Sequence, residues 1–201
     1  PYDMGVTLAY AGSRGINLLQ AKEGNPTIPQ FLADGRKFWA GNEPRTNPSW
    51  SNIELVTAAA SSWYNSMQFS LQKRLAHGLQ FQSSYTWSKA LDENQQVIVG
   101  DTSDYPSDPW DRRVDKGPAG FDIGTNWRFN AIYRLPGIGA TTGWKDKLLN
   151  GWWISGILTV QSGFPLTPDL TGNRSRSNNN SAFGGPSDRP DYAVGRTTEN
   201  I

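Results

Sequence analysis

Residues 65–75 read NSMQFSLQKRL and residues 79–89 read LQFQSSYTWSK, and these two stretches decide the fold class. Hydrophobic side chains alternate with Ser, Gln and Thr along both, a period of two residues that is typical of a β-strand. The residues between them, Ala76, His77 and Gly78, predict a tight turn in which Gly78 takes a positive φ angle. The two stretches therefore predict an antiparallel β-hairpin with one apolar face and one polar face.

The same alternation returns elsewhere in the chain. It predicts strands at residues 127–135, WRFNAIYRL, and 152–161, WWISGILTVQ, although Trp153 and Ile157 interrupt the polar face of the second. A shorter strand is predicted around residues 6–10. The chain therefore has room for about five or six strands long enough to cross a bilayer.

Three long segments rich in Gly, Pro, Asn and Asp separate these strands. They cover residues 11–52, 91–125 and 167–201, and we expect them to be loops. The run NRSRSNNN at residues 173–180 is of low complexity and predicts a mobile surface tip.

Composition excludes some classes of protein. The longest apolar stretches are far shorter than the roughly 18 residues that a transmembrane helix needs, so a membrane-spanning role would require β-strands. The 19 basic and 18 acidic residues nearly cancel, which argues against binding of nucleic acid. The chain has no Cys, which excludes disulfides and thiolate sites and is compatible with export.

Alternation alone fits either a soluble β-sandwich or a barrel in a membrane. Aromatic residues near the predicted strand ends favour the barrel, because amphipathic rings concentrate at a bilayer interface. If the tight turn at Gly78 is periplasmic, the long segment at residues 91–125 lies outside the cell. The predicted aromatic girdle consists of Trp63, Tyr64, Tyr85, Trp87, Trp127, Tyr133, Trp152, Trp153 and Phe164.

The fold class that we predict is all-β, an antiparallel transmembrane β-barrel segment that is incomplete. Residues 1–201 form part of one outer-membrane β-barrel domain, and the unpaired edges of the sheet require strands from outside the segment. The chain opens at Pro1 without an initiator Met or a signal peptide, so we expect an excised piece.

Candidate residues for chemistry are few. The acidic run DTSDYPSDPWDRRVDK at residues 101–116 holds the cation candidates Asp101, Asp104 and Asp108, but its spacing is not that of a calcium loop. We expect salt bridges there instead, with Asp111, Arg112 and Arg113 attaching the loop to the barrel wall or rim. His77 is the sole His and is predicted to be a turn residue. No catalytic residue and no cofactor site are predicted.

The polar phase of the strands supplies the candidates for a binding or lining role. They are Gln68, Gln82, Arg128, Asn130, Arg134 and Gln161. In a barrel these side chains point into the lumen, where they either contact a plug or substrate or simply line a hydrated wall.

Four phrases in order resemble the barrel domain of Oar-like TonB-dependent receptors. They are LAYAGSRGINL at 8–18, SSWYNSMQFSLQKRLAHGLQFQSSYTWSKALD at 61–92, DPWDRRVDKGPAGFDIGTNWRFNAIYRLP at 108–136 and GWWISGILTVQSGFPLT at 151–167. The chain departs from the resemblance at residues 124–128, GTNWR, where such receptors have an Arg-His-Arg-like strand entry. The resemblance implies a barrel of about 22 strands with a plugged lumen, energised through TonB. It also implies a plug and a carboxypeptidase-regulatory-like domain outside this segment.

The leading hypothesis is thus active transport of a large or scarce substrate across the outer membrane of a Gram-negative bacterium. The partners expected are outer-membrane lipid, the other strands and plug of the same protein, and the TonB complex. A passive porin or a surface adhesin is the alternative. A soluble carbohydrate-binding module that uses Trp39, Trp50 and Trp110 as stacking platforms ranks third.

Overall fold

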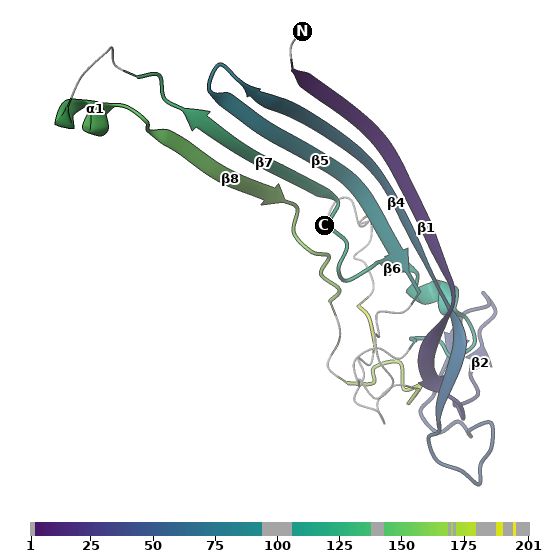
Figure 1. Cartoon of the computed structure of the whole chain (residues 1–201). Helices are drawn as coiled ribbons and strands as arrows, with labels where there is room; N and C mark the ends of the chain where they lie inside the picture. Colours follow the sequence, from purple (N-terminus) through teal and green to yellow (C-terminus); the bar gives the residue numbers. More distant parts are fainter. Residues whose placement is uncertain are drawn as a thin grey trace. The chain divides into compact units, whose positions relative to one another are not determined.

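The computed structural model describes residues 3–93, 106–137, 143–168, 170, 172–179, 188–190 and 195. Five long strands form one sheet in the order β1-β4-β5-β7-β8 (Figure 1). Their bounds are β1 Met4–Glu23, β4 Glu54–Ala76, β5 Leu79–Asp92, β7 Thr125–Arg134 and β8 Trp153–Gln161. The sheet is open, since β1 and β8 each have one neighbouring strand, and it agrees with the predicted all-β, incomplete barrel.

Short elements complete the described structure. The strand β6, Gly117–Pro118, pairs with the end of β5, while β2, Gln30–Phe31, pairs with β3, Lys37–Phe38. A 3-10 helix η1 spans Arg112–Asp115 and an α-helix α1 spans Trp144–Leu149. Among the described residues, no helix is long and apolar enough to cross a membrane.

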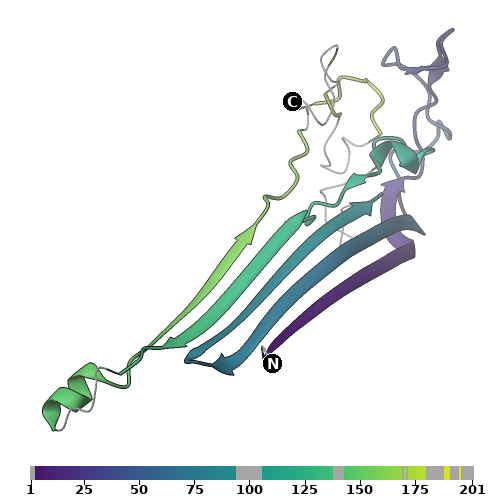
Figure 2. The same ribbon diagram turned by 90° about the horizontal axis from the view of Figure 1, so that it is seen from above.

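The chain divides into two compact units. Unit 1 comprises residues 1–13, 63–90 and 121–164, and holds the first half of β1, the second half of β4, most of β5, all of β7 and β8, and α1. Figure 2 shows these strands lying side by side. Unit 2 comprises residues 14–62, 91–120 and 165–201.

The strand register in unit 1 gives the sheet two chemically different faces. Tyr85 lies opposite Trp127, which in turn lies opposite Val160. Two residues along, Ser83 lies opposite Phe129, which lies opposite Leu158. Because paired residues share a face and alternate residues return to it, one face is apolar across three strands. The rings of Phe81 and Phe129 lie 6.0 Å apart, and those of Trp127 and Phe129 lie 6.2 Å apart, on this face.

Many large apolar side chains are exposed, whereas a soluble protein buries most of them in a core. Within the described part of the chain, the buried hydrophobic residues are Ala21, Ala60, Ala90 and Ala119. The exposed set includes Leu8, Phe69, Trp87, Ile154 and Val160 of the sheet. Such a broad apolar surface marks contact with lipid or with another protein and is unlike a soluble β-sandwich, which buries one face of each sheet.

The turn between β4 and β5 confirms the predicted hairpin. His77 and Gly78 both have positive φ angles, 51° and 78°, as the two central residues of a type I′ turn do. Positive φ was predicted at Gly78 alone. Gly78 also lies close to β7, since its carbonyl accepts a hydrogen bond of 2.7 Å from the Arg134 amide.

The predicted loop at residues 11–52 is wrong in its first part, because β1 continues to Glu23. The alternation changes sense there: Leu19 is exposed, whereas Gln20 is buried. Similarly, β4 begins at Glu54, well before the predicted start at Asn65. In these extensions apolar residues stand next to each other, as at Leu18 and Leu19 or Leu55 and Val56, so the period of two that reveals a strand is broken.

The predicted surface tip at residues 173–180 is also corrected for its described part, 173–179. Ser177 and Asn179 are buried. The Thr27 hydroxyl donates to the Ser177 carbonyl, and the Thr27 amide donates to Asn179 Oδ1 at 3.3 Å. Within unit 2 this run is therefore attached to residues near the end of β1. A run of Asn and Ser can pack in this way because its side chains satisfy buried polar groups.

Candidate functional site

The polar face of the sheet in unit 1 is the candidate functional site. Across β5, β7 and β8, Ser84 lies opposite Arg128, which lies opposite Thr159. Gln82 lies opposite Asn130 on the same face. The next row toward Trp87 consists of Thr86, Asn126 and Gln161.

Register thus brings together four of the six residues predicted to line the lumen: Gln82, Arg128, Asn130 and Gln161. Arg134 follows on the same phase of β7, opposite Trp153. Gln68 of β4 joins Ser84 and Arg128 at the hollow described next. That this face lines a barrel lumen stays a prediction.

A hollow of about 410 Å³ opens on this face. Its lining combines hydroxyl, amide, guanidinium and aromatic groups. The residues are Tyr64, Gln68, Ser84, Thr86, Ser88, Ala90, Phe121, Asp122, Ile123, Asn126 and Arg128. Hydroxyl and amide groups can donate and accept hydrogen bonds, so the hollow suits a polar partner such as a peptide segment or a hydroxylated molecule.

Asp122 holds one side of the hollow in place. Its Oδ1 accepts a hydrogen bond of 2.7 Å from the Ala90 amide, and its Oδ2 lies 3.2 Å from Lys89 Nζ. The carboxylate is buried and therefore needs these partners. Because β7 pairs with β5 only as far as Trp87 and β6 pairs with it from Leu91, Asp122 satisfies a β5 amide that lies between the two paired stretches.

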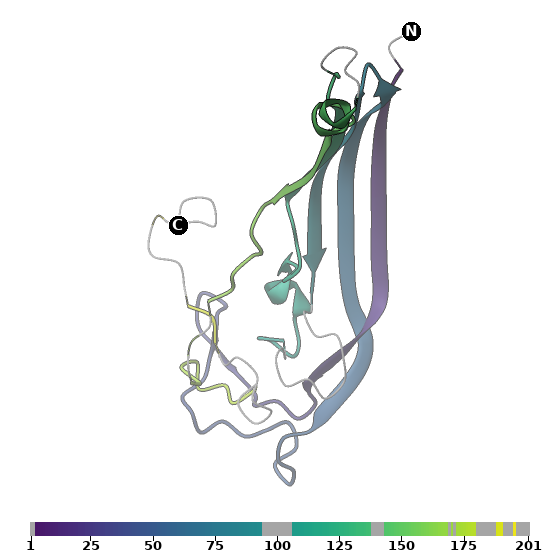
Figure 3. The same ribbon diagram turned by 60° about the vertical axis from the view of Figure 1, so that its left-hand side comes forward.

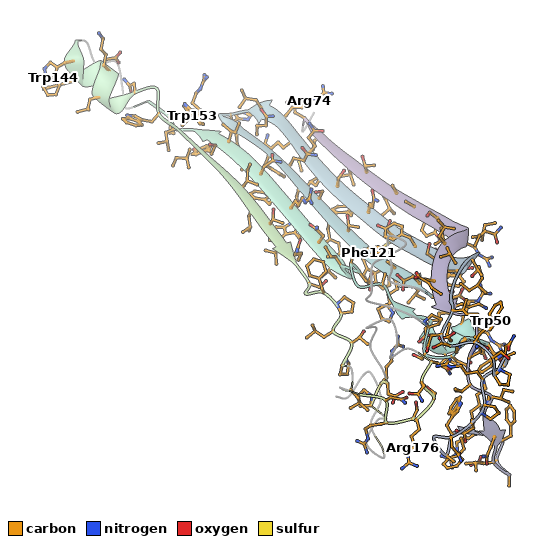
Figure 4. The ribbon with its side chains drawn as sticks, turned by 90° about the horizontal axis from the view of Figure 1, so that it is seen from below. Trp50, Arg74, Phe121, Trp144, Trp153 and Arg176 are labelled. Carbon is orange, nitrogen blue, oxygen red and sulfur yellow. The ribbon has the colours of Figure 1, made fainter. Side chains whose placement is uncertain are left out.

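The neighbouring residues strengthen the attachment. Ser88 Oγ donates to the Ile123 carbonyl at 2.7 Å, and the Ser88 amide donates to the Gly124 carbonyl at 2.9 Å. Phe121, labelled in Figure 4, is largely exposed at the edge of the hollow. Sequence analysis missed Asp122 and Lys89, because their contact joins segments separated by the whole of the loop after β5.

The predicted girdle residues take different places in the strands. Trp127 and Tyr133 lie near the two ends of β7, and Trp153 begins β8. Tyr85 and Trp87 lie inside β5, Trp63 and Tyr64 lie inside β4, and Phe164 follows β8. Strand ends and membrane boundaries need not coincide in a long strand, so a girdle at the membrane boundary stays a prediction.

The acidic segment of unit 2 is salt-bridged, as expected. Asp108 pairs with Lys37, whose Nζ lies 5.1 Å from the centre of the Trp110 ring. Arg189 lies 3.2 Å from Asp115 Oδ1. Among the described residues, no group of three or more acidic or His side chains could hold a metal ion. The cation candidates Asp101 and Asp104 lie outside the described residues.

The role predicted for Asp111 is corrected. Its carboxylate pairs with Arg113 at 2.9 Å and caps η1 by accepting from the Arg113 amide, so the pair is local and does not attach the loop to a barrel wall. Hydrogen bonds from the Arg113 side chain hold the pKa of Asp111 below its ordinary value of 3.8. Burial raises the pKa of Asp115 above 3.8, although Ser107 and Arg189 favour its ionised form.

An open antiparallel sheet with one broad, exposed apolar face and one polar face is the arrangement found in the wall of a membrane β-barrel. The chain belongs to the family described as outer membrane beta barrel domain, which it matches over residues 1–200. Its location is accordingly the outer membrane of a Gram-negative bacterium. Comparison with curated proteins and with solved structures gives no match.

Proposed function

We propose that this chain is part of the barrel wall of a TonB-dependent transporter of the Oar-like type, which moves a large or scarce substrate across the outer membrane. The observation that carries the proposal is the polar face with its hollow around Arg128. In a plugged barrel such a face meets a folded domain inside the lumen, and that contact needs many donors and acceptors. The four sequence phrases described above add support. No enzymatic activity is proposed.

The charge on the polar face favours a plugged barrel over an ion-selective porin. Over the paired residues 79–87, 125–134 and 153–161, this face carries two ionisable side chains, Arg128 and Arg134. Porins that select ions place rings of like charge in the pore. A wall made mostly of Ser, Thr, Asn and Gln is suited to hydrogen bonding with a plug or with a polar substrate.

The proposal is tested on the full-length protein with two probes, the purified periplasmic domain of TonB and sugars added to the outside of proteoliposomes. We expect the TonB domain to bind the detergent-solubilised protein. We also expect proteoliposomes to show no swelling with arabinose or stachyose, because a plug closes the lumen. Removal of the plug should make the same proteoliposomes swell.

Each alternative predicts a different result. A passive porin would cause swelling without any deletion and would not bind the TonB domain. An adhesin would neither bind TonB nor open a pore when upstream sequence is removed. Either result contradicts the transporter proposal while leaving the barrel fold intact.

A further inference from the structure

The connection from β7 to β8 carries a short helix with exposed apolar side chains. On α1, Trp144 and Leu148 are 71% and 57% exposed. They are four residues apart and so lie on one face of the helix. Figure 4 shows Trp144 at the end of α1 far from the strands. Exposing an indole and a leucine side by side to water is unfavourable, so we expect this face of the helix to contact a partner.

The helix is joined to the apolar face of the sheet. Trp152 Nε1 donates a hydrogen bond of 2.7 Å to the Leu148 carbonyl in the last turn of α1. Trp152 is on the same strand phase as Ile154, Leu158 and Val160, which lie on the apolar face. The exposed surface of α1 is thus continuous with the surface that the barrel presents to lipid.

The helix also lies at a definite end of the sheet. Figure 3 shows α1 at the end where β4 turns into β5. That turn has two central residues, and outer-membrane barrels place such short turns on the periplasmic side. The β7 to β8 connection, residues 135–152, is longer than such a turn requires.

Charge identifies the partner. Lys145 and Lys147 are exposed on α1, and Lys145 Nζ lies 5.8 Å from the centre of the Trp144 ring. The single carboxylate of the helix, Asp146, accepts a hydrogen bond of 2.6 Å from the Asn150 side chain. Exposed lysines beside Trp and Leu match the phosphate headgroups and the acyl boundary of a phospholipid leaflet.

We propose that α1 and Trp152 form an interfacial anchor that inserts Trp144 and Leu148 into the periplasmic phospholipid leaflet, with Lys145 and Lys147 at the lipid phosphates. The anchor would fix the height of the β7–β8 hairpin in the bilayer. This inference rests on the membrane location of the family and not on transport, so a failure of the TonB experiment would leave it unaffected.

The test uses the full-length protein in nanodiscs of phosphatidylcholine and phosphatidylglycerol. This chain has no Cys, so Leu148→Cys gives one site in it for an NBD label, with any Cys elsewhere replaced by Ser. We expect blue-shifted emission and a loss of about half its intensity when the lipids carry nitroxide near the headgroup. The matched control is Asp34→Cys, in the exposed turn between β2 and β3, which should show neither effect.

Emission typical of water at position 148 would overturn the proposal. Blue-shifted emission without lipid quenching would also overturn it, because a plug or periplasmic protein would then cover the helix. The double variant Lys145→Glu, Lys147→Glu should reduce quenching in the anionic nanodiscs but not in pure phosphatidylcholine. Equal quenching of this variant and the parent in both lipids would contradict the proposed contact between the two lysines and the lipid headgroups. Heat-modifiable migration on gels verifies that every variant is folded.

Discussion

At the scale of single residues, Glu23 organises the end of β1 in unit 2. Its side chain is 0% exposed. Oε1 accepts hydrogen bonds from the Asn25 amide at 2.7 Å and the Ile53 amide at 3.0 Å. Oε2 accepts one from Asn52 Nδ2 at 2.6 Å and lies 3.7 Å from Arg45. A buried carboxylate is tolerated because each oxygen is paired in this way.

We expect Glu23→Gln to destabilise this part of unit 2 by about 3 kcal/mol, because the amide nitrogen faces donors and Arg45 loses its counter-charge. In outer-membrane vesicles of the full-length protein, trypsin should then cleave unit 2 roughly a hundredfold faster. The matched control is Glu43→Gln, at a partly exposed carboxylate that accepts from the Ala40 and Gly41 amides. Equal cleavage of both variants would show that burial of Glu23 is unimportant.

Asp115 provides a prediction about pH. Burial raises its pKa above 3.8, so the folded chain holds this proton more tightly than the unfolded chain does. The resulting stability is fully present below pH 3.8 and is lost as the pH rises through the raised pKa. A carbon-detected NMR titration of the Asp carboxyls, assigned with Asp115→Asn, should give a midpoint above 3.8. Asp111 is the internal control and should titrate below 3.8, because Arg113 stabilises its charge.

At the scale of elements, the β4–β5 turn depends on Gly78. A Cβ atom at this position would lie 2.7 Å from the Arg134 carbonyl oxygen, a backbone atom of β7. Gly78→Ala should therefore cost about 2 kcal/mol, from positive φ and from this clash. Gly151→Ala is the control, since Gly151 has a φ of 83° but open space around it. Urea unfolding in detergent should show the larger loss for Gly78→Ala; equal losses would rule out the contact with β7.

Adjacent residues of β7 test the two faces of the sheet. Phe129 lies on the apolar face opposite Ser83 and Leu158, and Asn130 lies on the polar face opposite Gln82 and Ile157. We expect Phe129→Lys to destabilise the full-length barrel by about 2 to 4 kcal/mol, because it places a charge in lipid. Asn130→Lys should be tolerated in the same urea titration in lipid vesicles. A larger loss of stability for Asn130→Lys than for Phe129→Lys would show that the polar face, and not the apolar face, is in contact with lipid.

Sequence predicted strands well where the two faces differ in polarity. Residues 79–89 alternate cleanly, and β5 forms there. The prediction failed in the second half of β1, where Gln20 is buried and Leu19 is exposed. Hydrophobic periodicity cannot distinguish a polar interior from solvent. The helix α1 was not predicted, because six residues are too few to show a helical period of hydrophobic residues. At the site, the strand phase grouped Gln82 with Asn130 and Arg128, but Asp122 depends on a long-range contact with Ala90 that no local pattern encodes.

At the scale of the whole molecule, the unpaired edges of the open sheet limit the stability of residues 1–201 on their own. The edges of unit 1 are residues 4–13 of β1 and all of β8, and each has a neighbour on one side only. In an antiparallel strand every second residue turns its amide and carbonyl toward the missing neighbour, so each edge leaves roughly four or five such pairs unsatisfied. In lipid each unsatisfied group costs several kcal/mol. That total exceeds the roughly 5 to 15 kcal/mol of net stability that a whole domain has.

Residues 1–201 expressed alone should accordingly fail to fold as a monomer. In buffer without detergent the exposed apolar face, including Leu8, Trp87 and Ile154, should drive aggregation, which sedimentation velocity would detect. In detergent micelles the open edges should prevent heat-modifiable migration on gels. Restoring the remaining strands of the full-length protein closes both edges, so the same residues should then migrate as a folded barrel. A monodisperse, folded monomer of residues 1–201 in plain buffer would contradict the assignment of the apolar face to lipid, because water would then be a sufficient solvent for it.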